Sequence, residues 1–155
     1  RNKNIVLSIK VADCIPLFLH DEKTGLFGLI HSGWRGTVGG IAINSIKKMI
    51  QNGCNPAHIR AVIGPSICDK HFEVKNDVVS QFPSKYVVPK RDESFRVDLN
   101  EMVIDQLISM GIKSTSIHDS GLCTFCREDL FFSYRRDKKL NGRMIAFMGW
   151  SNPVA

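Results

Sequence analysis

The sequence has no long hydrophobic run. None of its 155 residues belongs to an apolar stretch that approaches the roughly 18 residues of a membrane-spanning helix. The first residues, RNKNIVLSIKVADC, contain neither the hydrophobic core nor the small-residue cleavage site of a signal peptide. We therefore expect a soluble, cytoplasmic protein without a membrane partner.

Cysteines are few and odd in number. Five cysteines in a chain without an export signal leave at least one thiol unpaired, so we do not expect a disulfide framework. The sequence holds a single CxxC, formed by Cys123 and Cys126, whereas a zinc ribbon needs two such pairs. We interpret these two residues as structural or incidental thiols. His71 follows Cys68 by three residues and could supply a metal ligand, but a surface histidine is favoured.

The positive charge of the chain is modest and dispersed. The formal charge is +6 at pH 7, but the lysines and arginines are spread along the sequence and no basic stripe interleaved with aromatic residues is present. We therefore expect no nucleic-acid partner. Anionic small molecules, phosphate included, fit this charge better.

Composition and hydrophobic pattern predict one globular domain over residues 1–155, because 43% of the residues are hydrophobic and 23% are charged. Helices are predicted from Val38 to Gly53 and from Asp98 to Gly111, the second with a near capping box. We also expect a short helical piece over 73–82 and an exposed excursion over 83–96. Strands are predicted over residues 5–11, 15–19, 26–30, 59–63, 112–117 and 144–148. This irregular order of elements indicates a layered α+β fold.

The stretch from Val11 to Gly40 carries the residues that we expect to do chemistry. Cys14 and His31 can share a metal ion or act as nucleophile and base, and spacing alone does not decide between these roles and purely structural ones. Asp13 is a candidate general base or ligand-orienting carboxylate, although a turn role is equally open. In a regular strand the Asp13 side chain would point to the opposite face from Cys14, and a bulge or a strand end would let both point to the same side.

Aromatic and cationic residues occur together in two places. The run FFSYRRD sets Arg135 and Arg136 beside aromatic rings, which suits stacking on a flat ring while a guanidinium binds phosphate or carboxylate. An edge strand with a charged end is the alternative. In HSGWRG, Trp34 can stack on a base or anchor the turn to the core. A helix that begins after this turn would favour anion binding near its first amides.

Several short motifs follow one another in a fixed order: ADCIP, HSGWRGT, IGPSI followed by HFEV, VDL, CTF, and FFSYRRD followed by GRM. In this combination the sequence resembles the YfiH family, whose members are described as laccase-domain proteins, polyphenol oxidases and purine nucleoside phosphorylases. The motifs extend from Asp13 to Met144. The resemblance implies a layered α/β/β/α sandwich.

The resemblance also implies a metal site, usually zinc, with ligands from the cysteine of ADC, the histidine of HSGWRG and a histidine in an upstream QxHG motif. The first two are Cys14 and His31 here, and the sequence contains no QxHG. We therefore interpret the chain as the C-terminal two thirds of such a domain, with its third ligand upstream. A divergent member that completes the site with another residue is the alternative.

Family resemblance implies action on purine nucleosides, by phosphorolysis of adenosine, inosine and methylthioadenosine and by deamination of adenosine. A zinc ion that lowers the pKa of water suits attack at C6 of adenine. The expected partners are thus a nucleoside and phosphate. Implied catalytic residues are Asp13, Cys14 and His31, and we infer substrate or phosphate contacts from Arg35, Arg135 and Arg136.

Three alternatives stay open. The sandwich also resembles the catalytic domain of cytotoxic necrotizing factor toxins, so Cys14 could be a nucleophile and His31 its base in a metal-independent hydrolase. A copper polyphenol oxidase would need histidines in close pairs, whereas the five here are scattered and form no HxH. An inactive binding domain is the third alternative.

Overall fold

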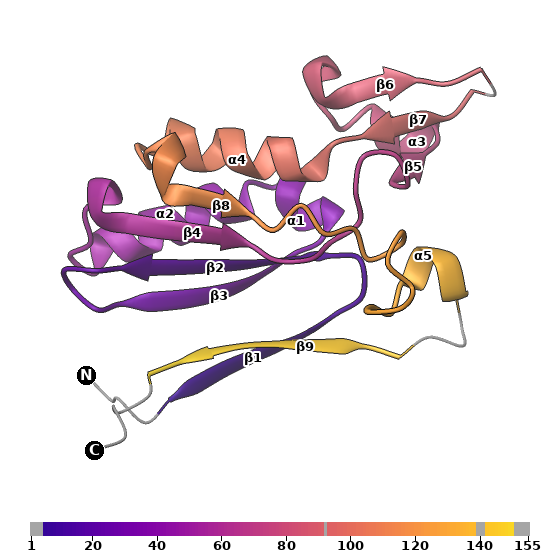
Figure 1. Cartoon of the computed structure of the whole chain (residues 1–155). Helices are drawn as coiled ribbons and strands as arrows, with labels where there is room; N and C mark the ends of the chain where they lie inside the picture. The colour runs from indigo at the N-terminus through magenta and orange to yellow at the C-terminus, as the bar shows by residue number, and fades with distance from the viewer. Residues whose placement is uncertain (1–4, 92, 139–141, 151–155) are drawn as a thin grey trace.

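A four-stranded sheet forms the centre of the computed structural model, which describes residues 5–91, 93–138 and 142–150 (Figure 1). The strand order is β3-β2-β4-β8, and β2 runs antiparallel to both β3 and β4 while β4 and β8 are parallel. The strands are β2 (Ile15–Asp21), β3 (Phe27–Ser32), β4 (Ile59–Ile63) and β8 (Ile117–Asp119). With two smaller sheets and a few helices, the chain has the mixed α+β fold that the sequence predicts.

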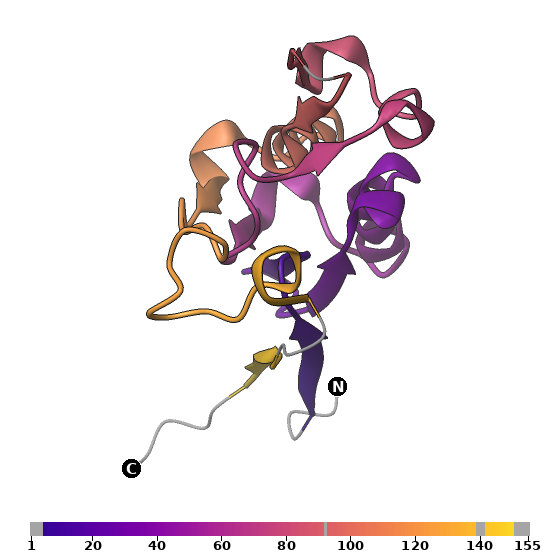
Figure 2. The same ribbon diagram turned by 90° about the vertical axis from the view of Figure 1, so that its right-hand side faces the viewer.

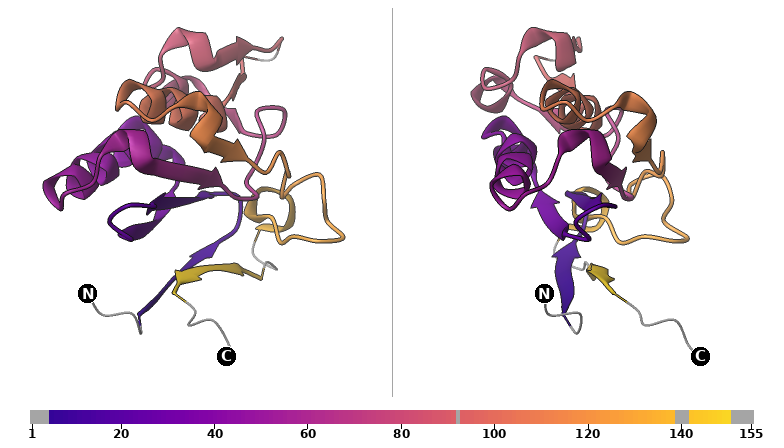
Figure 3. Two further views of the ribbon diagram at one scale, coloured as in Figure 1. Left: turned by 60° about the vertical axis from the view of Figure 1, so that its left-hand side comes forward. Right: turned by 90° about the vertical axis from the view of Figure 1, so that its left-hand side faces the viewer.

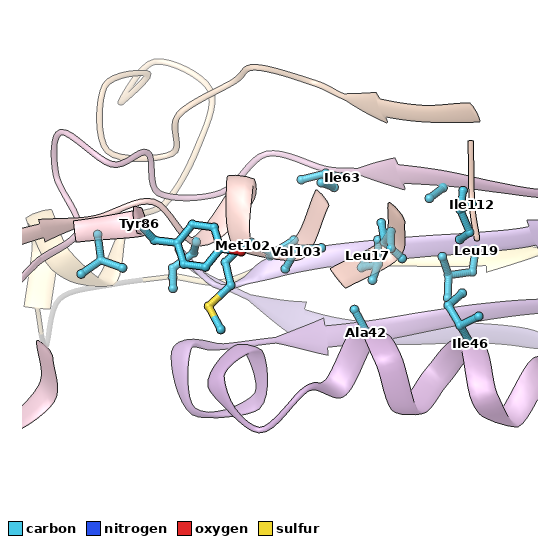
Figure 4. Close-up of a cluster of buried hydrophobic side chains, with 14 of the residues drawn as sticks. Leu17, Leu19, Ala42, Ile46, Ile63, Tyr86, Met102, Val103 and Ile112 are labelled. Carbon is cyan, nitrogen blue, oxygen red and sulfur yellow. The ribbon is translucent and has the colours of Figure 1, made fainter. Parts of the chain in front are cut away.

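Three helices pack with this sheet, and they are α1 (Trp34–Val38), α2 (Ile41–Gln51) and α4 (Leu99–Ser109). Figure 3 shows α2 and α4 side by side, and the two helices contact each other. Leu17 and Leu19 of β2 are fully buried, and Figure 4 shows Ala42 and Ile46 of α2 in the same buried cluster. Alternate burial along β2 and β4 thus directs one face of the sheet into the core.

The helix predicted from Val38 to Gly53 is confirmed as α2, which begins at Ile41, and the separate short helix α1 precedes it. Gly40 has a φ of 72°, a left-handed conformation that favours glycine, and it lies between α1 and α2. The first helix starts inside the HSGWRG turn, at Trp34. The second predicted helix is confirmed: the Asp98 carboxylate caps α4 by accepting from the Glu101 amide at 2.9 Å.

The predictions for residues 112–117 and 83–96 are wrong. Residues 112–117 do not form a strand, because Ile112 is buried against the end of α4, where its amide donates to the Leu107 carbonyl, and a 3-10 helix follows over Ser114–Ser116. The strand β8 starts at Ile117 instead.

The segment predicted as an exposed excursion belongs to a three-stranded sheet. Its strands are β5 (Glu73–Val74), β6 (Val87–Pro89) and β7 (Phe95–Val97), with the short helix α3 (Asn76–Val79) between the first two. Tyr86 is buried and its hydroxyl donates to Asp105 of α4 at 2.9 Å, which ties this sheet to the core. Tertiary contacts of this kind leave little trace in a local sequence pattern.

The first and last described strands form an antiparallel ribbon of β1 (Val6–Val11) and β9 (Met144–Gly149). Val6, Ile145 and Phe147 of this ribbon are exposed apolar side chains, and Phe147 is 70% exposed in this chain. Figure 2 shows the short helix α5 (Tyr134–Asp137) near the chain segment that connects β1 to β2. Among the described residues, no helix has the length and apolar character to cross a membrane.

A buried carboxylate secures the turn between β2 and β3. Asp21 is fully buried and accepts backbone N–H bonds from Lys23, Thr24 and Asn55 at 2.8, 2.9 and 3.2 Å. Burial alone raises the pKa of Asp21, but these hydrogen bonds stabilise the charged form and lower the pKa below its ordinary value.

Replacing Asp21 by alanine is expected to lower the free energy of unfolding by about 2–4 kcal/mol, since three amides lose their acceptor. Because the folded pKa is depressed, this stabilisation is present above the unfolded pKa of about 4 and is lost as the pH falls through the folded value. Urea denaturation at pH 7 and pH 3 measures both effects. Glu22→Ala, an exposed neighbour, is the control, and an Asp21→Ala variant as stable as this control would contradict the prediction.

Candidate functional site

A left-handed turn places Asp13 and Cys14 at the end of the central sheet. Asp13 has a φ of 80°, unusual for a residue other than glycine, and its side chain is buried. Its carboxylate accepts from the Thr124 hydroxyl and from the Arg135 amide, both at 2.7 Å, and its carbonyl accepts from the Ile67 amide. The turn breaks the regular strand geometry, so Asp13 and Cys14 can line the same cavity. Asp13 thereby connects the turn to three distant residues of the chain, Ile67, Thr124 and Arg135.

Cys14 lines a cavity of about 310 Å³ together with Asp13. Burial and the nearby Asp13 carboxylate raise the pKa of the Cys14 thiol, while Arg143 acts in the opposite direction. A side chain at position 33 would have its first carbon 3.1 Å from the Cys14 sulfur, so glycine is the residue that leaves the thiol undisturbed. The other walls of the cavity include three aromatic rings and one guanidinium: Trp34, Phe72, Tyr134 and Arg135.

His31 lies near the end of β3, opposite Pro16 of β2, and is exposed. Cys14 directly precedes β2, so neighbouring strands bring the predicted pair to the same end of the sheet. One thiol and one imidazole are donors that zinc accepts, and a catalytic zinc typically has three protein ligands. The two residues therefore have the chemistry of zinc ligands, as the sequence predicts.

The three predicted arginines have different surroundings. Arg135 is exposed, lines the cavity, donates from Nη1 to the Glu73 carbonyl at 2.6 Å and lies 5.5 Å from the Phe72 ring. Arg35 is exposed and its guanidinium lies 4.3 Å from the centre of the Trp34 ring. Both can present charge towards a ligand near the aromatic walls.

Arg136 is held entirely by the protein. Its Nη1 donates to the Thr124 and Phe125 carbonyls, and its Nη2 donates to the Phe131 carbonyl. Its Nε and Nη2 also donate to the Asp137 carboxylate. A guanidinium has five N–H donors, and these five bonds use all of them. Arg136 therefore secures the loop that contacts Asp13 and has no spare donor for phosphate.

A second, larger hollow of about 720 Å³ adjoins the first, because Glu73, Val74 and Arg135 line both. Its wall carries three cationic side chains and two carboxylates, so positive charge is in excess: Lys70, Lys75, Arg135, Glu73 and Asp77. A small anion next to an aromatic ligand would find complementary groups across these two hollows.

The structure also gathers four residues that the sequence leaves unrelated. The ligand atoms of Cys68, His71, Cys123 and Cys126 all lie within 4.8 Å of one another, close enough to share a metal ion. His71, for which a surface position was favoured, and the CxxC, interpreted as structural or incidental thiols, thus belong to one group that could hold a metal ion. The signal was present as a CxxH and a CxxC, but their pairing depends on a contact across 55 residues of sequence.

Comparisons with known proteins show which family the sequence belongs to. The family model described as multi-copper polyphenol oxidoreductase laccase matches residues 1–151. A purine nucleoside phosphorylase, YlmD of Bacillus subtilis, is 38% identical over 154 residues, which cover 95% of this chain and 55% of that protein. The adenosine deaminase RL5, from an unknown prokaryotic organism, is 34% identical over 143 residues, or 88% of this chain and 55% of that protein.

Solved structures show the same fold. YfiH of Bacillus licheniformis superimposes with a TM-score of 0.92 at 37% identity, and the match covers 97% of this chain and 59% of the YfiH chain. YlmD of Geobacillus stearothermophilus gives a TM-score of 0.89 at 35% identity, over 96% of this chain and 58% of its own. The chain thus spans somewhat more than half the length of these relatives. It belongs to the multi-copper polyphenol oxidoreductase laccase family, which includes YfiH and YlmD.

Proposed function

We propose that this chain forms part of a zinc-dependent purine nucleoside enzyme that catalyses phosphorolysis of the glycosidic bond or deamination of adenosine. The observation that carries the proposal is the cavity in which Cys14 and Asp13 lie beside aromatic rings and a guanidinium. The relatives named purine nucleoside phosphorylase and adenosine deaminase support the same substrate class.

The walls of the cavity suit a nucleoside in distinct ways. Trp34 and Phe72 offer flat apolar surfaces for a purine ring. Arg135 has donors beyond the one bound to the Glu73 carbonyl, and these can contact phosphate in the adjoining hollow. Arg35, held over the indole of Trp34, is a second proposed anion contact.

We assign the proton-transfer role to Asp13. Its carboxylate faces the cavity, and the Thr124 hydroxyl and the Arg135 amide fix its orientation at 2.7 Å each. A carboxylate oxygen has more than one lone pair, so these bonds leave capacity to accept a proton from a substrate or water.

Cys14 and His31 are the proposed zinc ligands of this chain, and a third ligand from another part of the protein would complete the set. When bound, zinc supplies a Lewis acid that polarises a substrate group and lowers the pKa of water. The Cys14 side chain is half-buried, and its sulfur lies beside Gly33 on the wall of the cavity.

Replacing Cys14 by serine is expected to reduce kcat/KM for adenosine by at least about 100-fold, because a metal ligand is lost. Chromatography of incubations with adenosine or inosine, with and without phosphate, distinguishes free base from inosine as product. Cys54→Ser, at a buried cysteine outside the cavity, is the matched control and should retain activity. Formation of neither free base nor inosine by the unmodified protein would overturn the proposal.

The same assay separates the alternatives. A metal-independent nucleophile needs a lowered thiol pKa, whereas burial raises the pKa of Cys14. Activity lost to a chelator and restored by zinc supports the metal role, and activity that survives chelation supports a Cys14–His31 dyad. Because the family description names copper, oxidation of polyphenols in the presence of copper is measured as well. Absence of every activity would support a binding domain.

A further inference from the structure

We propose that Cys68, His71, Cys123 and Cys126 form a second metal site, a closed Cys3His zinc site that is separate from Cys14 and His31. Two loops supply its ligands: the segment after β4 supplies a CxxH, and the segment after β8 supplies a CxxC. The ion would therefore connect parts of the chain that are 52 residues apart at their nearest ligands, His71 and Cys123.

The geometry matches a tetrahedral site. The His71 Nδ1 atom lies 3.3 Å from the sulfur of Cys68, 3.5 Å from that of Cys126 and 3.9 Å from that of Cys123. Zinc–sulfur bonds of about 2.3 Å and zinc–nitrogen bonds of about 2.0–2.1 Å at tetrahedral angles give sulfur–nitrogen separations of about 3.6 Å. The observed distances are grouped around this value. One zinc ion thus fits among the four ligand atoms without large movement of the chain.

The surroundings hold these ligands in place before an ion binds. The His71 ring stacks on Phe125 with ring centres 4.1 Å apart and planes at 14°. The Cys68 amide donates to the Cys123 sulfur at 3.4 Å, a hydrogen bond that favours a thiolate. Ser66 forms a β-bridge with Cys123, which joins the two loops through their backbones. Cys126 is exposed, so an ion can enter from solvent.

The ligand set indicates both the metal and its role. Three thiolates and one imidazole select zinc over calcium or magnesium, which prefer oxygen ligands. Four protein ligands leave no open position for substrate, as in structural zinc sites. Its effect would be on the walls of the cavity, because Thr124, between the two cysteines, donates to Asp13, and His71 and Phe125 line the larger hollow.

Metal stoichiometry tests the proposal without reference to enzyme activity. Elemental analysis of the purified, reduced protein is expected to show about one zinc per chain that persists in Cys14→Ser. Cys126→Ser and His71→Asn should each lose this zinc, whereas the control variants Cys54→Ser and His58→Asn should retain it. Full zinc retention in both cluster variants, or loss of all zinc in Cys14→Ser alone, would overturn the proposal.

Cobalt substitution tests the site in the unmodified protein, so the result does not depend on whether a variant folds. In the unmodified protein, Co²⁺ bound to three thiolates should give near-ultraviolet charge-transfer absorption about three times that expected from Cys14 alone, with visible bands of tetrahedral Co²⁺. Alkylation followed by peptide mapping should show Cys68, Cys123 and Cys126 protected together by zinc. Labelling of all three in zinc-saturated protein, or a native disulfide among them, would contradict the site.

Discussion

Asp13→Ala is expected to lower the free energy of unfolding by about 3–5 kcal/mol and to reduce activity beyond detection. The substitution removes the acceptor of the Thr124 hydroxyl and of the Arg135 amide, and buried donors without acceptors cost about 1–3 kcal/mol each. It also leaves alanine in a left-handed conformation, with a φ of 80°. Urea denaturation followed by intrinsic fluorescence measures the loss of stability.

Two further variants separate the structural role of Asp13 from its proposed chemistry. Asp13→Asn keeps an oxygen acceptor and tolerates the left-handed conformation, so it should recover most of the stability but little kcat. Asp129→Ala is the control, because this exposed carboxylate pairs with Arg127 on the same loop. A fully active Asp13→Asn variant would show that proton transfer does not require this carboxylate.

Arg136→Ala is expected to lower the free energy of unfolding by about 3 kcal/mol, since three backbone carbonyls and the Asp137 carboxylate lose their donors. Its side chain is 19% exposed, so water replaces these bonds poorly. The matched control is Arg127→Ala, whose side chain is 45% exposed and pairs with a surface carboxylate; this variant should change stability by less than about 1 kcal/mol.

Kinetics should distinguish Arg136 from its neighbour. Arg135→Ala is expected to raise the KM for phosphate about tenfold, because a guanidinium that faces the cavity is removed, with a smaller change in stability. Arg136→Lys should lose stability and leave the KM for phosphate nearly unchanged in the folded fraction. The reverse pattern would show that Arg136, rather than Arg135, contacts the anion.

Local signals were sufficient for much of the fold. The apolar run around Leu17 and Leu19, the capping pair Asp98 and Glu101, and the helical spacing around Ile46 each depend on residues close in sequence, and the structure confirms the elements that they predict. The interpretation fails where a distant contact decides. Ile112 does not start a strand, because it is held against the end of α4, and Tyr86 ties the predicted excursion to the core through Asp105.

By itself, the sequence determined the α+β class and the family and selected Cys14, His31 and Asp13 as candidate site residues, because short motifs and periodic patterns express local chemistry directly. Only the tertiary structure decided what these residues contact. It assigned Arg136 to the protein's own carbonyls, and it placed Cys68 and His71 beside the CxxC. Neighbouring residues cannot encode these contacts locally, since each forms only when the chain folds and brings segments tens of residues apart within bonding distance.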